Sequence, residues 1–355
     1  MRAFTYDALP MRVRFGDDSR MQLPEELDAL GLKSAVVLTS PEQVELGNAV
    51  NDILGSAGRG VYPHAEMHVP LERAQAARDF VAQVGADAVI CAGGGSTTGL
   101  GKAIAMTAGI PIVALPTTYA GSEMTPIWGL TDNAIKRTGR DRRVLPRSVV
   151  YDPTLTVGLP IKASVMSGLN AVAHAAEGLY APDASPIISM MAEDGISKML
   201  SALPRIASDP QDRDGRSDAL YAAWLCGAVL GATTMGLHHK LCHILGGTFN
   251  LPHADTHTVV LPYVLAFNLS ASPDARTAVQ RAVGSQTPAG ALRDLAIQLG
   301  GPASLAELGM PSDGIPEVVR QAVDTPYSNP RDVTPDALTK LVTDAFDGAQ
   351  PDEEY

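Results

Sequence analysis

The chain has 355 residues, enough for two domains and for a large buried core that needs no disulfide or structural metal. Hydrophobic residues make up 45% and charged residues 19%, which excludes the disordered and fibrous classes. The formal net charge is −12 and Lys and Arg form no run, so we expect no nucleic-acid partner and no binding to an anionic membrane.

The cysteines and the hydropathy pattern indicate in which cellular compartment the protein is found. Cys91, Cys226 and Cys242 are widely spaced and form no CxxC pair, so we expect no disulfide framework. The first residues alternate like a strand and contain no apolar core of signal-peptide length. No apolar run is long enough to span a bilayer. We therefore expect a cytoplasmic protein.

The first half of the chain alternates short β-like runs with helical stretches. We predict buried strands at 34–39, 87–91 and 111–115, and a short apolar run at 60–62. Helical spacing of apolar residues predicts helices between them, at 41–54, 71–84 and 96–108. This alternation is typical of βαβ units in a parallel sheet.

The second half is rich in Ala, Leu and Met and has few β-branched runs. Its periodicity predicts helices at 164–180, 185–203, 217–235, 289–299, 315–323 and 335–346. The change of texture near residues 153–162 predicts a domain boundary. We place an α/β dinucleotide-binding domain at residues 1–157 and an all-α catalytic domain at residues 158–355.

A glycine-rich turn, Gly93 to Ser96, follows the strand at 87–91 and opens the next helix. Glycines let the backbone approach a pyrophosphate, and Ser96 is predicted to cap the helix whose first N–H groups would face that anion. The turn lacks the GxGxxG spacing of the usual dinucleotide fingerprint. A turn without a ligand is the alternative, but three consecutive glycines favour a phosphate-binding loop.

A second loop, at residues 115–123, follows the next strand and carries the hydroxyls of Thr117, Thr118 and Ser122. Parallel sheets bind ligands beyond the carboxyl ends of their strands. The two loops together therefore predict one cofactor cleft.

Histidines are concentrated late in the chain. Five of the eight lie between residues 238 and 257. His239 and His243 share one face of a helix, Asn170 and His174 have the same spacing on another, and His253 is expected in a loop. Such a cluster suits either a metal ion or metal-free proton transfer. We expect His238 and His257 to be its structural members.

These segments together resemble the iron-containing alcohol dehydrogenase family, and within it the maleylacetate reductases. The resemblance covers nearly the whole chain. The motifs that carry it are GGGSTTGLGKAIA from Gly93, LPTTYAGSEMT from Leu115, YDPTLTVGLP from Tyr151, SGLNAVAHAAEGLY from Ser167, GLHHKLCHILGGTFNLPHADTHTVVLP from Gly236 and NPRDVT from Asn329.

The resemblance implies a Rossmann-like N-terminal domain, a helical C-terminal domain and a nicotinamide cofactor. Thr39 matches the position where the family chooses between cofactors, but neither it nor Ser40 carries an acid, so NADH and NADPH both stay open. The other positions that match cofactor-binding residues are Gly94, Gly95 and Ser96 of the pyrophosphate loop, Thr117, Thr118 and Ser122 of the second loop, and Lys136.

Two departures from the metal-dependent members bear on the chemistry. Gly99 replaces an Asp of the motif GGGSxxDxAK, and the Asp of the Asp-plus-three-His ligand set is replaced by Asn170, beside His174, His239 and His253. Because a neutral amide neutralises no cation charge, we expect no metal. The maleylacetate reductases share both departures.

The implied reaction is reduction by NAD(P)H of the conjugated C=C bond of maleylacetate to 3-oxoadipate, in the degradation of aromatic compounds. His243 is our candidate proton donor. We expect His174, His239 and His253 to supply polar contacts and Asn170 to donate its amide hydrogens. The substrate is a small dicarboxylate, for which Lys240 is one basic candidate, and the sequence does not choose among the arginines.

Three other functions remain open on the sequence. A metal-dependent alcohol dehydrogenase of the same fold is disfavoured by Asn170. A dehydroquinate synthase-like lyase fits poorly after Gly236, and a non-catalytic nucleotide-binding protein would not need the histidines. The resemblance also implies a homodimer.

Overall fold

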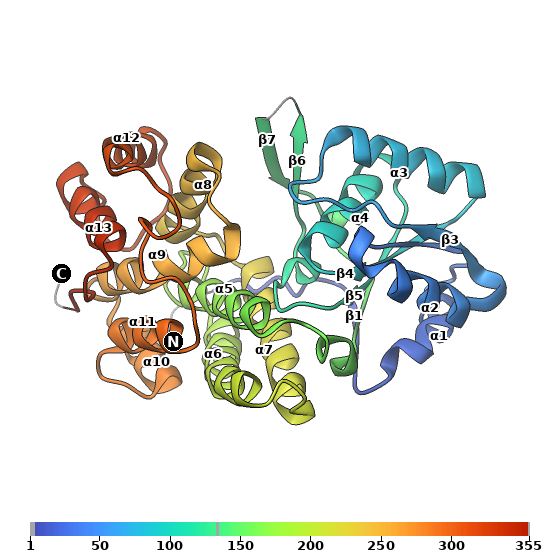
Figure 1. Ribbon diagram of the computed structural model, residues 1–355, viewed down its shortest axis with the longest axis horizontal. Coiled ribbons are helices and arrows are strands. Elements are labelled where there is room, and N and C mark those ends of the chain that lie inside the picture. Colours follow the sequence, from blue (N-terminus) through green and yellow to red (C-terminus); the bar gives the residue numbers. More distant parts are fainter. Residues whose placement is uncertain (1–3, 133–134, 354–355) are drawn as a thin grey trace. The chain divides into compact units, whose positions relative to one another are not determined.

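The computed structural model describes residues 4–132 and 135–353, apart from the side chains of residues 135 and 136. The chain divides into two compact units (Figure 1). The α/β unit begins at Ala8 and ends at Leu159, and the helical unit begins at Pro160 and includes residues 4–7. The sequence analysis placed its boundary between residues 157 and 158.

The α/β unit is built on a six-stranded sheet in the order β1-β8-β5-β4-β2-β3. Every pairing in this sheet is parallel. The strands predicted at 34–39, 87–91 and 111–115 are confirmed as β2, β4 and β5. The bounds are β1 (Arg12–Phe15), β2 (Ala35–Leu38), β3 (Gly58–Tyr62), β4 (Ala88–Gly93), β5 (Ile112–Pro116) and β8 (Ser148–Tyr151).

Successive side chains of a strand point to opposite faces of the sheet. Because the strands carry apolar side chains on both faces, helices cover both of them. Val36 and Cys91 pack against α3 and α4 on one face. Val37 and Ile90 pack against α1 and α2 on the other. Each fully buried Val or Ile contributes about 1.5–3 kcal/mol to stability. The helices are α1 (Leu23–Ala29), α2 (Val44–Leu54), α3 (Leu71–Val84) and α4 (Gly95–Ala108).

The order of the strands determines where a ligand can bind. From β2 the chain continues through α2 to β3, whereas from β4 it continues through α4 to β5, on the opposite side. Neighbouring strands whose connections diverge in this way leave a crevice at their carboxyl ends. Thr39 follows β2 and Gly94 follows β4, so both lie at this crevice.

A separate antiparallel hairpin, β6 (Ile127–Asp132) and β7 (Ile135–Arg140), was not predicted. Trp128 packs on Gly139, where a Cβ would come within 2.9 Å of the indole ring. Among its described residues, the N-terminal stretch that alternates like a strand forms a strand only at Arg12–Phe15.

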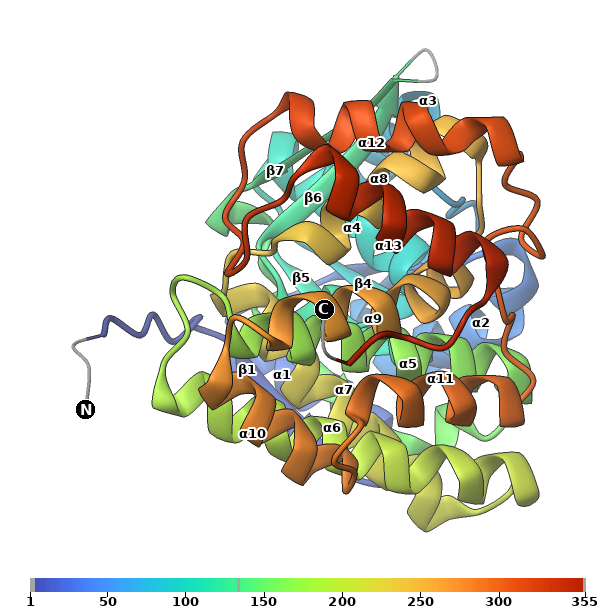
Figure 2. The ribbon, with the colours of Figure 1, turned by 90° about the vertical axis from the view of Figure 1, so that its left-hand side faces the viewer.

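In the helical unit, α5 packs against α6, α7 and α9, and α8 packs against α9 and α12 (Figure 2). Six predicted helices are confirmed as α5, α6, α7, α11, α12 and α13. Helices α9 and α10 were not predicted. The bounds are α5 (Ile161–Leu179), α6 (Pro186–Ser208), α7 (Arg213–Ala232), α8 (Leu237–Phe249), α9 (His253–Leu269), α10 (Pro273–Val283), α11 (Pro288–Gln298), α12 (Ile315–Asp324) and α13 (Pro335–Asp347).

Among the described residues, no helix by itself has the length and apolar composition that a membrane span requires. Helices α7 and α8 pass that test only when taken together, and they are bent by 96° to one another.

Candidate functional site

The glycine-rich turn joins β4 to α4 at the crevice of the sheet. Gly94 is the N-cap residue of α4 and, having no side chain, supplies no cap to the first N–H groups of this helix. The predicted cap at Ser96 is therefore wrong, because the helix already begins at Gly95. An N-terminus that lacks a capping side chain at the N-cap position suits an anionic phosphate.

The space beside Gly94 is too small for a side chain, whereas the space beside Gly95 is open. A Cβ on Gly94 would lie 3.0 Å from the Cγ2 of Thr118, whereas a Cβ on Gly95 would meet nothing closer than Ala120, at 3.9 Å. Gly95 is exposed, and Ser96 and Thr118 are partly buried. The backbone at Gly95 can thus approach a ligand without a side chain in between.

Two threonines complete the same edge of the sheet. Thr117 follows β5, and its Oγ1 accepts a 3.0 Å hydrogen bond from Gln43 Nε2, which lies just beyond β2. Thr39 is fully buried, and its Oγ1 has no hydrogen-bond partner among the described residues. The glycine turn, the uncapped helix and this unpartnered hydroxyl fit a dinucleotide.

Lys102, on α4, is a residue that the sequence analysis missed. Its buried Nζ donates to the backbone oxygen of Ser122 at 2.7 Å, to Thr125 Oγ1 at 2.9 Å and to the backbone oxygen of Ile127 at 2.7 Å. Burial lowers the pKa of Lys102 to about 7, against the attraction of Glu123. Lys102 therefore ties the helix of the glycine turn to the second loop.

Lys136 and Gly99 are the remaining positions from the sequence analysis in this unit. Lys136 lies in β7, but its side chain is outside the described part of the structure. A Cβ on Gly99 would come within 2.8 Å of Val69 Cγ2, so Val69 occupies the space that an Asp side chain would need.

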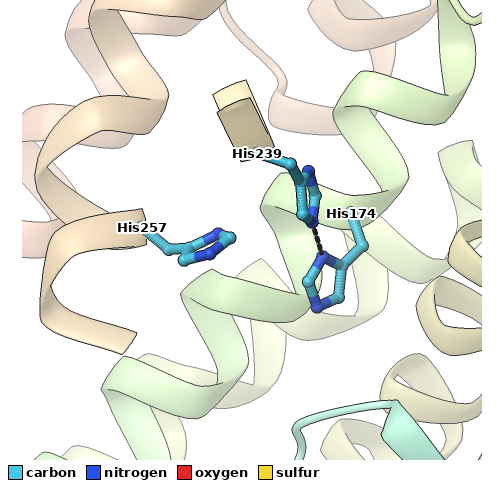
Figure 3. Close-up of side chains that lie close together, drawn as sticks. All are labelled: His174, His239 and His257. Atoms are coloured by element: carbon cyan, nitrogen blue, oxygen red, sulfur yellow. Dashed lines mark hydrogen bonds between the residues drawn. The ribbon is translucent and has the colours of Figure 1, made fainter. Parts of the chain in front are cut away.

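The imidazole cluster lies in the helical unit, where Figure 3 shows His174, His239 and His257 approaching one another from three helices. These three side chains are buried, whereas His243 and His253 are exposed. Asn170 and His174 are on α5, His238, His239 and His243 are on α8, and His253 and His257 are on α9.

The exposed histidines adjoin the buried ones. The ring of His253 lies 4.3 Å from that of His257, and the ring of His243 lies 6.3 Å from that of His239, between centroids. His253 is the first residue of α9, so the prediction that it lies in a loop was wrong. The cluster is one group of side chains with a buried part and an exposed part.

A chain of hydrogen bonds links four buried side chains. Glu177 contacts His239 Nδ1, and His239 Nε2 lies 2.9 Å from His174 Nδ1. His174 Nε2 in turn lies 3.2 Å from Asn170 Nδ2. Glu177 was missed by the sequence analysis. It is one of only two charged residues in α5, with Lys162, and this isolation in an apolar helix was an available signal.

Glu177 is an ionised acceptor in this chain. The backbone N–H of His238 donates to it at 2.8 Å and that of His239 at 3.4 Å, both at the start of α8. Burial by itself would raise the pKa of Glu177, but His239, His238 and the backbone N–H of His238 lower it below its ordinary value.

Asn170 ends this chain with its amide nitrogen toward His174. Its Nδ2 contacts His174, while its Oδ1 is buried without a partner among the described residues. Nδ2 keeps a second hydrogen beside the one directed at His174, so Asn170 offers a ligand both a donor and an acceptor.

His238 and His257 form a second buried pair, with His238 Nε2 2.9 Å from His257 Nδ1. The other ring nitrogen of each is buried and has no partner within the described chain. Burial lowers the pKa of His238 to about 3, so its imidazole is neutral near pH 7. The buried Tyr327 hydroxyl also has no described partner, and burial and Glu177 raise its pKa to about 12.

Of the four positions that bind a metal in metal-dependent members, His174 and His239 lie close to His257, which is not one of the four. One nitrogen each from His174, His239 and His257 lie within 4.8 Å of one another, which is close enough for a single ion by distance alone. However, Asn170 brings no negative charge, and His174 Nδ1 and His239 Nε2 are hydrogen-bonded to each other. The four family positions therefore supply no anionic ligand, and two of their imidazoles are already hydrogen-bonded to each other.

Comparison with known families covers both units. Residues 10–153 match the family described as iron-containing alcohol dehydrogenase, and residues 164–346 match the C-terminal part of the Fe-containing alcohol dehydrogenase family. The chain belongs to the iron-containing alcohol dehydrogenase family. The predicted fold class is thereby confirmed.

Several members of this family are similar along the whole chain. A maleylacetate reductase from Burkholderia cepacia is 55% identical, over 99% of this chain and 100% of its own length. One from Sphingobium indicum is 49% identical, over 98% and 99%. The crystal structure of maleylacetate reductase from Agrobacterium tumefaciens has a TM-score of 0.96 and 46% identity, covering 99% of this chain and all of that one.

Proposed function

We propose that this member of the family reduces the conjugated C=C bond of maleylacetate to 3-oxoadipate, with NADH or NADPH as reductant. The observation that carries the proposal is the similarity, at 49% and 55% identity over essentially full length, to two maleylacetate reductases. Asn170, in place of the acidic ligand of metal-dependent relatives, supports the same reading.

The electronic structure of the substrate makes this reaction possible without a Lewis acid. When bound, the nicotinamide supplies a hydride, which adds to the alkene carbon far from the ketone. The electron pair of the double bond then moves to the ketone oxygen as an enolate. A proton added to the neighbouring carbon completes the reduction, so that one hydride and one proton are consumed. Hydrogen-bond donors suffice to stabilise such an enolate.

The exposed part of the imidazole cluster is suited to this proton transfer. His243 and His253 are exposed in the helical unit, and both adjoin buried imidazoles. We assign the proton donation to His243 and a polar contact to the substrate to His253. His174, His239 and Asn170 hold the cluster in place behind them.

We further propose that no metal ion takes part. The neutral amide of Asn170 and the hydrogen bond between His174 and His239 support this proposal. The alternative of a metal-dependent alcohol dehydrogenase rests on the closeness of His174, His239 and His257.

The remaining parts of the proposal concern partners and place. We propose a small dicarboxylate substrate, a homodimer, a cytoplasmic location and a role in the degradation of aromatic compounds, with neither nucleic acid nor membrane as a partner. The net charge of −12 supports the absence of a nucleic-acid partner. Light scattering of the purified protein measures the homodimer directly.

A stopped assay with maleylacetate tests the function. Oxidation of NADH or NADPH with formation of 3-oxoadipate, unchanged after exhaustive chelation, is the expected result. Turnover that disappears on chelation and returns with a divalent ion would favour the metal-dependent alternative. Absence of net NAD(P)H oxidation would contradict the reductase function.

A further inference from the structure

The buried chain Glu177–His239–His174–Asn170 has three contacts, and each needs one hydrogen. A neutral imidazole has one ring N–H and one lone pair, a carboxylate only accepts, and an amide nitrogen only donates. The direction of the whole chain can therefore be deduced from its two ends.

The direction begins at Glu177. This carboxylate already accepts the backbone N–H groups of His238 and His239, at 2.8 and 3.4 Å, so it faces His239 as an acceptor. His239 then carries its hydrogen on Nδ1 and presents a lone pair on Nε2. His174 must likewise carry its hydrogen on Nδ1, which donates to His239 over 2.9 Å.

The last contact fixes the role of Asn170. His174 Nε2 is left with a lone pair, and the amide Nδ2 of Asn170 lies 3.2 Å away. The amide therefore supplies the third hydrogen. All three contacts are satisfied with both imidazoles neutral, the carboxylate ionised and no cation present.

We propose that Asn170 ends this chain as a hydrogen donor and thereby takes the place of the cation that an aspartate at position 170 would require, with Glu177 as the positioning residue that fixes both imidazole tautomers. The inference rests on the proposed metal-free function and names the residues responsible for it.

An aspartate at position 170 would leave the contact between His174 and His239 without a hydrogen. An acceptor at each end would draw the ring hydrogens of His239 and His174 outward, to Nδ1 and Nε2. The two nitrogens 2.9 Å apart would then face each other with two lone pairs. Such a buried contact repels unless a positive charge, a proton or a metal ion, lies at it.

The tautomers of the unaltered protein are the first test. Long-range proton–nitrogen NMR spectra of protein labelled with ¹⁵N-histidine distinguish Nδ1–H from Nε2–H, and His174→Gln and His239→Gln identify the two signals. We expect Nδ1–H on both rings without added metal. An Nε2–H form of either ring would overturn the inference, even in an enzyme that reduces maleylacetate. The Nδ1–H pattern in a protein that leaves maleylacetate unchanged would contradict only the proposed function.

Binding of Zn²⁺, measured by calorimetry, is the second test. We expect Asn170→Asp to bind Zn²⁺ about a hundredfold more tightly than the unaltered protein, the scale on which groups around a site change metal affinity. Asn268→Asp makes the same change at a fully buried amide on a different helix, α9. This variant should bind Zn²⁺ as weakly as the unaltered protein. Equal affinity in the unaltered protein and Asn170→Asp would overturn the inference. If Asn170→Asp does not fold, the tautomers of the unaltered protein decide.

Discussion

Thr39 and Gly47 approach each other so closely that a Cβ on Gly47 would lie 2.9 Å from the Cγ2 of Thr39. Gly47 of α2 therefore lies against Thr39 at the end of β2, and the Thr39 hydroxyl is buried without a described partner. A buried polar group left unpaired costs about 1–3 kcal/mol. Such a cost is removed when a bound cofactor supplies the missing hydrogen bond.

Replacing Thr39 by Val should therefore separate stability from cofactor binding. We expect the melting temperature of the cofactor-free protein to stay equal or rise, because the shape is kept and the unpaired hydroxyl is gone. NADH and NADPH should bind up to about tenfold more weakly, since one hydrogen bond contributes about 0.5–1.5 kcal/mol. Scanning calorimetry and fluorescence titration measure the two effects.

Thr156 provides the matched control. It is equally buried in the same unit, but its hydroxyl donates a 2.8 Å hydrogen bond to Pro153. Thr156→Val should lower the melting temperature and leave cofactor binding unchanged. If Thr39→Val shows this same pattern, the Thr39 hydroxyl is structural and does not contact the cofactor.

The glycine turn leads to a second prediction. A Cβ on Gly95 meets no atom of the protein within 3.9 Å, so Gly95→Ala should leave the stability of the cofactor-free protein unchanged. The methyl group would occupy the path of a pyrophosphate, so binding of NADH should weaken by about tenfold or more, a loss of at least about 1.4 kcal/mol. Titration with NADH measures this loss. Gly158→Ala, where a Cβ meets nothing within 4 Å, should change neither property. Normal NADH binding by Gly95→Ala would place the pyrophosphate elsewhere.

The sequence predicted the elements whose pattern is local. Strands β2, β4 and β5 are fully buried runs bounded by turns, and α5 to α7 have a recognisable helical composition. Helix α9 was missed because it is buried almost all round, so its apolar residues show no helical period. The hairpin β6–β7 was missed because it pairs mixed polar and apolar strands outside the main sheet.

The residue types and their spacing predicted which residues belong to the candidate site, but not how their side chains contact one another. The clustering of histidines and the glycine turn are visible in the sequence, so most positions could be named. The contact of Glu177 with His239 joins residues 62 positions apart, and nothing local indicates it. The orientation of the Asn170 amide depends on that same distant carboxylate, so the side chain that receives its hydrogen could not be predicted.

Glu26 gives a prediction about pH. Although burial opposes ionisation, hydrogen bonds from Arg12, Ser148 and Arg14 lower the pKa of this carboxylate to about 2, from 4.5. Its contribution to stability is therefore complete above pH 4.5 and is lost as the pH falls toward 2. Glu26→Gln should destabilise the α/β unit at pH 7 by about 1–2 kcal/mol, since solvent screens the exposed Arg12 and, in part, the half-buried Arg14.

The difference in stability between the unaltered protein and Glu26→Gln should shrink between pH 4.5 and 2. Urea unfolding at a series of pH values measures it. Glu25→Gln is a suitable control, because Glu25 lies beside Glu26 on α1 but has its side chain 67% exposed. A difference that stays constant down to pH 2 would mean that Glu26 is not ionised in the folded protein.

His243 is the residue on which the proposed proton transfer depends most directly. Because its side chain is exposed, His243→Ala should keep the fold and the melting temperature. Loss of a general acid lowers turnover by about 10²–10⁴-fold, so kcat for maleylacetate should fall by that factor while the affinity for NADH stays unchanged. His64→Ala, at an exposed histidine of the α/β unit, should leave kcat unchanged. Steady-state kinetics settle the assignment: a His243→Ala variant with full turnover would leave His253 as the exposed imidazole of the cluster able to deliver the proton.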